Sequence, residues 1–117
     1  MWFEPLPDQC PPEEATVPNG IFYRVTESST VTCEDFWSHR KLNPTQKYNT
    51  NECRAMAVSV FDTQPAAQKL LLLERHRHKV VTAIKLDPTA GKIEKNGAPN
   101  HFSWWRATDY PVLQNVV

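Results

Sequence analysis

The chain has 117 residues, of which 13 are basic and 13 are acidic, so its formal net charge is zero. This length fits one ordinary domain with a single core. The balanced charge excludes the overall basic excess of proteins that bind mainly to phosphate backbone, while a local basic patch stays compatible with it. No apolar run approaches the length of a membrane span, and residues 1–5 lack the positive start of a secretory signal. We therefore expect a cytoplasmic protein.

Three cysteines are present, Cys10, Cys33 and Cys53, and they show neither an even number nor paired short spacing. This pattern predicts reduced thiols rather than a disulfide scaffold. A zinc site would need help from His76 and His78, which are two residues apart and could share one face of a strand. No CxxC motif accompanies them. We therefore expect a solvated basic turn there, and no metal.

Residues 1–20 are expected to form an extended, proline-rich arm in front of a single domain over residues 21–117. Five of the ten prolines fall within the first eighteen residues, which leaves too few backbone donors for a regular element. Trp2 and Phe3 could pin the arm through their aromatic rings. Whether it packs on its own chain or on a neighbour stays open, because exchange of such an arm is a simple route to a homodimer.

The first half of the domain predicts a strand, a short helix, a loop and a second strand. Residues 21–25 are rich in aromatic and β-branched side chains, as strands are. Thr32 can cap a short helix that begins with two carboxylates. Residues 40–50 are polar and predict a loop. Residues 56–61 alternate small and apolar side chains, which predicts a strand buried on both faces.

The second half predicts a helix, a central strand and a hairpin. Asp62 or Thr63 can cap a helix with an apolar stripe that ends at Leu73. Residues 79–86 give the clearest strand of the chain, which we place centrally in the sheet. Residues 92–95 and 102–106 can form the two sides of a hairpin, and residues 111–117 can add an edge strand. The predicted fold class is α+β, with a small, mostly antiparallel sheet and two helices packed on it.

Three motifs resemble those of a group of small, uncharacterised bacterial proteins. They are Thr-Cys-Glu-Asp-Phe-Trp-Ser-His at 32–39, Ala-Val-Ser-Val-Phe-Asp-Thr at 57–63 with Ala66, and His-Phe-Ser-Trp-Trp at 101–105. The resemblance covers roughly residues 21–117. It implies a bacterial or phage origin and a cytoplasmic location, and it implies no particular activity.

A further set of residues is similar to the ADP-ribosyltransferase-like fold. Tyr23-Arg24 at the end of a first strand, Ser59 on a second strand, and a later Glu94 or His101 occur in the order found there. The resemblance implies an NAD site in which arginine holds a phosphate and serine positions the nicotinamide ribose. Without it, Arg24 fits an exposed or ion-paired strand residue and Ser59 a small residue where two elements approach closely.

The densest cluster of unusual side chains is His101-Phe102-Ser103-Trp104-Trp105-Arg106. In an extended segment Trp104 and Trp105 point to opposite faces, so we expect one indole at the surface beside Arg106, available for stacking on a partner. The sequence therefore predicts a recognition module that binds a protein or a nucleotide-like ligand. Its predicted contact residues are Tyr23, Arg24, Trp37, His101, Trp104, Trp105 and Arg106.

Two enzymatic alternatives stay open. The first is an ADP-ribosyltransferase-like or degenerate NAD-binding enzyme that uses Tyr23, Arg24, Ser59 and His101. His101 could act as a general base there, provided that a nucleophile lies within hydrogen-bond reach. The second is a nuclease built from His76, His78, His101 and Arg106. No cofactor is expected for the recognition module, whereas the first alternative would require NAD.

Overall fold

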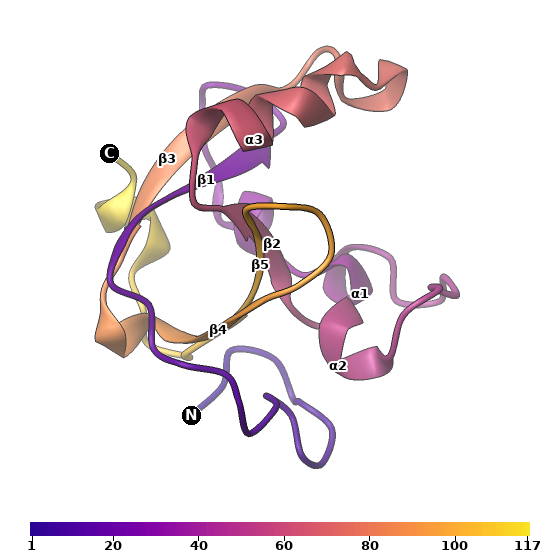
Figure 1. Ribbon diagram of the computed structural model, residues 1–117, viewed down its shortest axis with the longest axis vertical. Helices are drawn as coiled ribbons and strands as arrows, with labels where there is room; N and C mark the ends of the chain where they lie inside the picture. Colours follow the sequence, from indigo (N-terminus) through magenta and orange to yellow (C-terminus); the bar gives the residue numbers. More distant parts are fainter.

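A computed structural model describes residues 1–117 and shows an α+β fold around one antiparallel sheet. The strands lie in the order β3-β1-β2-β5-β4, and every neighbouring pair is antiparallel (Figure 1). This confirms the predicted α+β class and the antiparallel sheet. The strands are β1 (Gly20–Thr26), β2 (Val58–Phe61), β3 (Val80–Leu86), β4 (Gly91–Lys95) and β5 (His101–Arg106).

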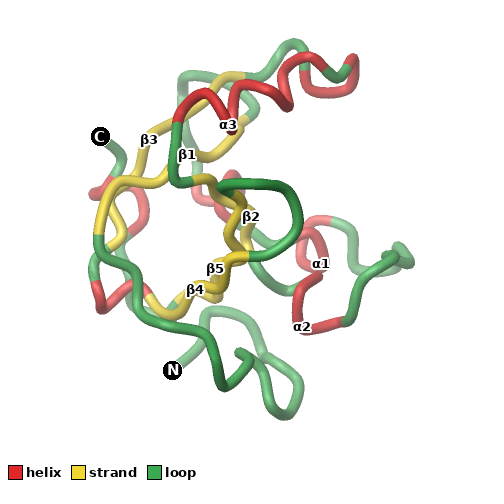
Figure 2. The backbone as a smooth tube through the Cα atoms, in the orientation of Figure 1, coloured by secondary structure: helices red, strands yellow, loops and turns green.

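The helices are short, and much of the chain forms connecting loops (Figure 2). Three α-helices are present where two were predicted: α1 (His39–Leu42), α2 (Glu52–Ala55) and α3 (Gln64–Gln68). Each begins at a side chain that accepts a hydrogen bond from the first turn, namely Ser38, Asn51 and Thr63. None of the helices is both long and apolar enough to cross a membrane. Five 3₁₀ turns complete the fold: η1 (Cys33–Phe36), η2 (Lys69–Leu72), η3 (Glu74–His76), η4 (Pro88–Ala90) and η5 (Val112–Asn115).

Two predictions about the second half of the domain are wrong. Strand β3 lies at the edge of the sheet, because it pairs with β1 on one side and meets only a single bridge, from Val116 to Ile84, on the other. The closing segment is therefore the 3₁₀ turn η5 rather than an edge strand. The predicted helix also stops at Gln68, and two 3₁₀ turns carry the chain beyond the sheet at the upper right of Figure 1. The leucines expected on a buried helical stripe lie outside the main core, with Leu70 and Leu71 half-buried and Leu73 exposed.

The main hydrophobic core lies on one face of the sheet. Alternate strand residues point toward it, and the segments around η1, η4 and η5 close it. Trp104 is fully buried there, donates its indole N–H to the carbonyl of Ala90 and meets the ring of Tyr110 edge-on. The core comprises Phe22, Phe36, Val58, Val60, Ile84, Leu86, Ala90, Ile93, Trp104, Tyr110 and Val112.

The N-terminal segment covers part of the opposite face. Trp105 points to that face, and it is fully buried against Ala15 and Ala57, with Trp2 and Leu6 packed around them. Single β-bridges join Trp2 to Ala107 and Thr16 to Ile93. Trp104 and Trp105 point to opposite faces, as the strand geometry predicts. The expected exposed indole is not found, because the N-terminal segment covers Trp105.

Two polar anchors hold the start of the N-terminal segment. The carboxylate of Glu4 is buried and accepts hydrogen bonds from the hydroxyl and backbone N–H of Ser38, at 2.6 and 3.2 Å. The ring centroid of Phe3 lies 3.7 Å from the guanidinium carbon of Arg106. A charged or stacked group at each anchor fixes the segment more specifically than apolar contact alone.

A disulfide joins Cys10 to Cys53 across 43 positions of sequence, and it lies beside Trp105. The prediction of reduced thiols is therefore wrong for these two residues. Cys33 is the one free cysteine, and it is exposed. The bond fixes the N-terminal segment to the loop that precedes β2, so it closes the second hydrophobic cluster covalently.

The phenol of Tyr110 predicts a loss of stability at alkaline pH. It is buried and donates a hydrogen bond to the carbonyl of Lys85, and burial raises its pKa above the ordinary value. The unfolded chain loses this proton near about pH 10, whereas the folded chain retains it to higher pH. The contribution is therefore complete below about pH 10 and is lost as the pH rises through the folded-state pKa. Urea midpoints measured from about pH 8 upward should fall more steeply for the wild type than for Tyr110→Phe, and parallel curves would contradict this assignment.

Candidate functional site

The guanidinium of Arg24 fills a gap between strands β1 and β2. The ladder between these strands is reduced to one residue pair, Tyr23 with Phe61. Beyond it, Arg24 donates from Nη1 to the carbonyl of Ser59 at 2.8 Å and from Nε to the carbonyl of Asp35 at 2.5 Å. Its Nη2 reaches the carbonyl of Trp37 at 3.5 Å. The side chain thus joins two strands to the η1 segment.

Burial lowers the pKa of Arg24 to about 10, and the charge of Asp35 partly offsets that effect. The guanidinium therefore stays charged at neutral pH. All three of its nitrogens already serve backbone carbonyls of the chain. A phosphate would have to displace these bonds, so the geometry favours a structural role for Arg24 over phosphate binding.

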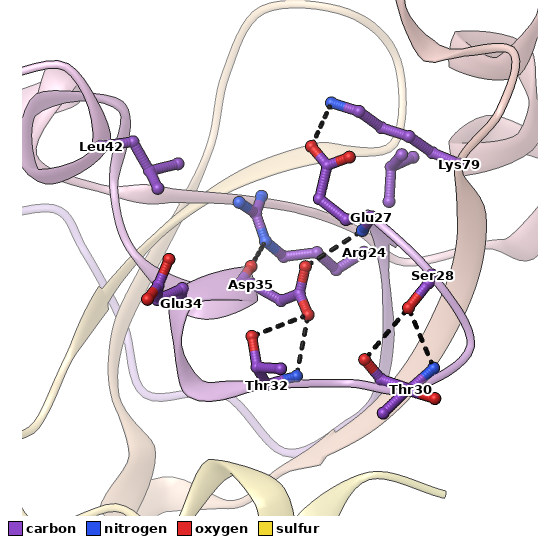
Figure 3. A pocket seen from close by; sticks show the side chains of 10 residues that line it. Arg24, Glu27, Ser28, Thr30, Thr32, Glu34, Asp35, Leu42 and Lys79 are labelled. Carbon is purple, nitrogen blue, oxygen red and sulfur yellow. Dashed lines mark hydrogen bonds and ion pairs between the residues drawn. The ribbon is translucent and has the colours of Figure 1, made fainter.

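A polar cavity of about 320 Å³ lies beside Arg24, between the end of β1 and η1 (Figure 3). Apart from Glu34, its charged groups have partners within the chain. The Asp35 carboxylate accepts from the backbone N–H groups of Glu27 and Thr32, and Lys79 lies 3.4 Å from the Glu27 carboxylate. The cavity therefore offers no unpaired cation for a nucleotide phosphate. Its lining residues are Arg24, Val25, Glu27, Ser28, Thr30, Thr32, Glu34, Asp35, Leu42 and Lys79.

Ser59 and His101 form a hydrogen-bonded pair on neighbouring strands β2 and β5. Ser59 Oγ lies 3.1 Å from His101 Nε2, and His101 Nδ1 lies 2.7 Å from the carbonyl oxygen of Asn96. A carbonyl can only accept, so Nδ1 carries a proton, and in the neutral imidazole Nε2 then accepts from the serine hydroxyl. This is the arrangement of a nucleophile, a base and an orienting group.

The surroundings of this pair are a compact polar network. Ser103 stands directly opposite Ser59, and its hydroxyl exchanges hydrogen bonds with the Asn96 side chain at 3.0 and 3.1 Å. The ring of Phe61 meets His101 edge-on. Neither described cavity includes Ser59 or His101. The pair therefore has the geometry of an activated serine and lies outside both of these cavities.

The structure brings the predicted enzymatic residues together only in part. Ser59 connects to both Arg24 and His101, through its carbonyl and its hydroxyl respectively. Strand alternation puts the Arg24 side chain on the face of Phe22 and the Ser59 side chain on the opposite face with Phe61. One ligand could not contact both polar groups without passing through the sheet.

The aromatic cluster that the sequence singled out does not form a surface. Trp104 and Trp105 are 0% exposed and Arg106 is 7% exposed. The predicted surface at these three residues is therefore wrong, because the main core covers Trp104 and the N-terminal segment covers Trp105. Trp37 is half-buried, with Lys41 Nζ lying 4.5 Å from its ring centroid.

The nuclease alternative is weakened because Arg106, one of its four residues, is buried. Arg106 is buried, whereas His76 and His78 lie in and just after η3, on the segment that projects past the sheet (Figure 1). His78 Nε2 lies 3.2 Å from the Glu27 carboxylate, in an exposed pair. The four residues therefore do not share one surface.

No known protein family matches this chain. No curated protein and no solved structure matches it either. The functional argument therefore rests on the geometry of the chain itself.

Sequence reasoning missed the exposed leucines that follow α3. Leu70 and Leu71 are half-buried, whereas Leu72 and Leu73 are exposed, with Leu72 at 77%. The sequence contains the signal, four consecutive leucines followed by Glu-Arg-His-Arg-His-Lys, but the same residues also fit an apolar stripe on a core helix. We call residues 70–73 the leucine segment.

Proposed function

We propose that the protein is a small recognition module that binds a protein partner through the leucine segment and its basic neighbours. The carrying observation is that four successive leucines lie outside the core, on a segment that projects past the sheet (Figure 1). Contiguous exposed apolar side chains on a soluble domain mark interaction sites. Removing them from water on binding supplies the driving force for association.

The charge around the leucine segment indicates what kind of partner fits. Residues 69–79 contain four cations and one carboxylate, which gives 4 − 1 = +3 with neutral histidines. Arg75 and Arg77 are exposed and make no ion pair. A partner with an apolar groove and an acidic rim complements both features, since apolar contact gives affinity while opposite charge guides encounter and register.

A nucleotide-like ligand, the other predicted class, is less well supported. The polar cavity beside Arg24 has no unpaired cation, and both Trp104 and Trp105 are buried. At Arg24, Trp104 and Trp105, therefore, neither phosphate binding nor base stacking has a free group.

Affinity capture with matched variants tests the proposal. Wild-type protein and Leu72→Glu/Leu73→Glu are immobilised and exposed to extract from the organism of origin, and retained proteins are quantified by mass spectrometry. We expect a retained partner to be lost from the double variant and kept by Val17→Glu/Val117→Glu, which adds the same charge at other exposed apolar positions. Arg75→Ala/Arg77→Ala should weaken retention and reduce its salt dependence. Identical retained proteins for all four forms would contradict the proposal.

A second candidate function rests on the hydrogen bond between Ser59 and His101. An ADP-ribosyltransferase-like or NAD-binding enzyme would use this pair with Tyr23, which strand alternation places on the same face, whereas Arg24 lies on the opposite face. A ligand that binds only the folded state raises the unfolding midpoint. Thermal unfolding with NAD and ADP-ribose should therefore show an increase that Ser59→Ala abolishes; unchanged midpoints with both compounds would contradict this candidate.

The proposal also covers the cellular compartment of the protein and the role of its N-terminal arm. Disulfides persist mainly in oxidising compartments, so the bond between Cys10 and Cys53 counts against the expected cytoplasmic location.

The β-bridges of Trp2 and Thr16 to their own chain count against the predicted homodimer through the N-terminal arm. Sedimentation of the full chain, with a monomer expected, tests that point. The bacterial or phage origin stays a prediction.

A further inference from the structure

A second cavity, of about 210 Å³, lies between the start of η1 and the C-terminal segment. The exposed thiol of Cys33 and the guanidinium of Arg106 line it together. Apolar side chains of the C-terminal segment form much of the remaining wall. These further lining residues are Tyr110, Pro111, Val112, Leu113 and Gln114.

Arg106 reaches this cavity with most of its hydrogen-bonding capacity unused. It is 93% buried, and Nη1 donates to the carbonyl of Phe36 at 2.7 Å. Its Nε is buried without a hydrogen-bond partner and is closed to solvent, whereas Nη2 makes no hydrogen bond and is not closed off in this way. A guanidinium presents five N–H donors in a planar fork, and those at Nη2 are free to donate to a carboxylate in the cavity.

No anion of the chain neutralises this guanidinium at contact distance. Arg106 forms no ion pair within 4.0 Å, and the nearby Glu4 carboxylate is held by Ser38. The ring of Phe3 covers the guanidinium at 3.7 Å. A buried cation of this kind is costly without a partner. An anionic group that entered the cavity would supply one.

We propose that this cavity binds small disulfides bearing a carboxylate, and that Cys33 exchanges with them to form a mixed disulfide. Arg106 holds the carboxylate while the Cys33 thiol, after losing its proton to solvent, attacks one sulfur. The new bond joins Cys33 Sγ to that sulfur, and the original S–S bond breaks. The other half leaves as a thiolate, which takes up a proton. Cys33 is thereby oxidised and the small disulfide is reduced.

Two further observations support the exchange. The chain already contains one disulfide, so Cys33 is the odd cysteine of an oxidised protein, a pattern typical of a reactive or pairing thiol. Burial lowers the pKa of Arg106, and a thiolate at Cys33 or the carboxylate of Glu4 opposes that effect. Cys33 and Arg106 lie on the wall of the same cavity, so a molecule held by the guanidinium has the thiol beside it.

The rate of Cys33 modification by three short disulfides tests the proposal on the full chain. The probes are dianionic 3,3′-dithiodipropionate, neutral 2-hydroxyethyl disulfide and dicationic cystamine, and intact-mass spectrometry follows the reaction at neutral pH. Each rate is divided by that of N-acetylcysteinamide, which removes the intrinsic reactivity of the probe. We expect the dianionic probe to be favoured over the neutral one by about tenfold, the factor that one charge-assisted contact of modest strength gives. A ratio equal to that of the model thiol would overturn the proposal.

Two companion measurements keep the test independent of any folding defect. Sodium acetate, compared with sodium chloride at equal ionic strength, should slow the dianionic probe and leave the neutral probe unchanged. Arg106→Gln, checked by tryptophan emission, should remove the preference between the probes while Cys33 still reacts. Cys33→Ser should not react at all. Equal slowing of both probes by acetate would contradict a carboxylate site at Arg106.

Discussion

Trp104→Ala is expected to lower the free energy of unfolding by about 3–5 kcal/mol, the range for truncating a large buried aromatic side chain. The indole is fully buried on strand β5, its N–H donates to the carbonyl of Ala90, and its ring meets Tyr110 edge-on. Removal creates a cavity in the main core and takes away the hydrogen bond from the indole, while the Ala90 carbonyl still accepts from the backbone N–H of Ala107. Urea denaturation followed by far-ultraviolet circular dichroism measures the change.

Trp37→Ala serves as the matched control for Trp104→Ala. Trp37 is only half-buried and packs beside the ammonium group of Lys41, so the loss of stability should be clearly smaller. A Trp104 variant as stable as the wild type would mean that the indole is exposed. That result would restore the recognition surface predicted from the sequence.

Cys10→Ser/Cys53→Ser is expected to lower the free energy of unfolding by about 4 kcal/mol, from the loop-closure entropy that a bond across 43 positions removes from the unfolded chain. The second hydrophobic cluster, around Trp105, should also loosen, because the bond lies at its edge. Thermal or urea unfolding of the purified variant measures both effects together.

Cys33→Ser is the control for the disulfide variant, since Cys33 is exposed and unpaired. It should unfold within about 0.5 kcal/mol of the wild type, as exposed substitutions usually do. If reducing agent left the wild type as stable as before, or if the double variant matched Cys33→Ser, the bond between Cys10 and Cys53 would not be holding the N-terminal segment.

The strands were largely predictable, because local composition determines them. β1 and β3 are rich in β-branched and aromatic residues. The turn that connects β4 to β5 in their hairpin contains Gly97, which has a positive φ of 74°. Alternation along β5 also gave the opposite directions of Trp104 and Trp105. These features depend on neighbours in sequence, which a single sequence contains.

The burial of Trp105 was not predictable in the same way, because a distant segment causes it. The sequence indicated a proline-rich arm, but not that residues 2–15 would cover the second face of β5. The disulfide has the same origin, since three cysteines without short spacing leave its pairing undetermined. Long-range contacts of this kind decide which side chains reach the surface.

The candidate site was misjudged for a related reason. Four leucines after a capped helix predict an apolar core stripe, and only the end of α3 at Gln68 shows that they project past the sheet. Ser59 and His101, by contrast, were singled out from the sequence and do share a hydrogen bond. Their contact required the register of β2 with β5, which brings Phe61 opposite His101.

The stability of Leu72→Glu/Leu73→Glu tests the central claim most directly. If the leucine segment is a free surface, as its exposure indicates, the double variant should unfold within about 0.5 kcal/mol of the wild type. Urea denaturation alone decides this point, without a known partner. A loss of several kcal/mol would show that these leucines belong to the core, and would contradict their assignment as the recognition surface.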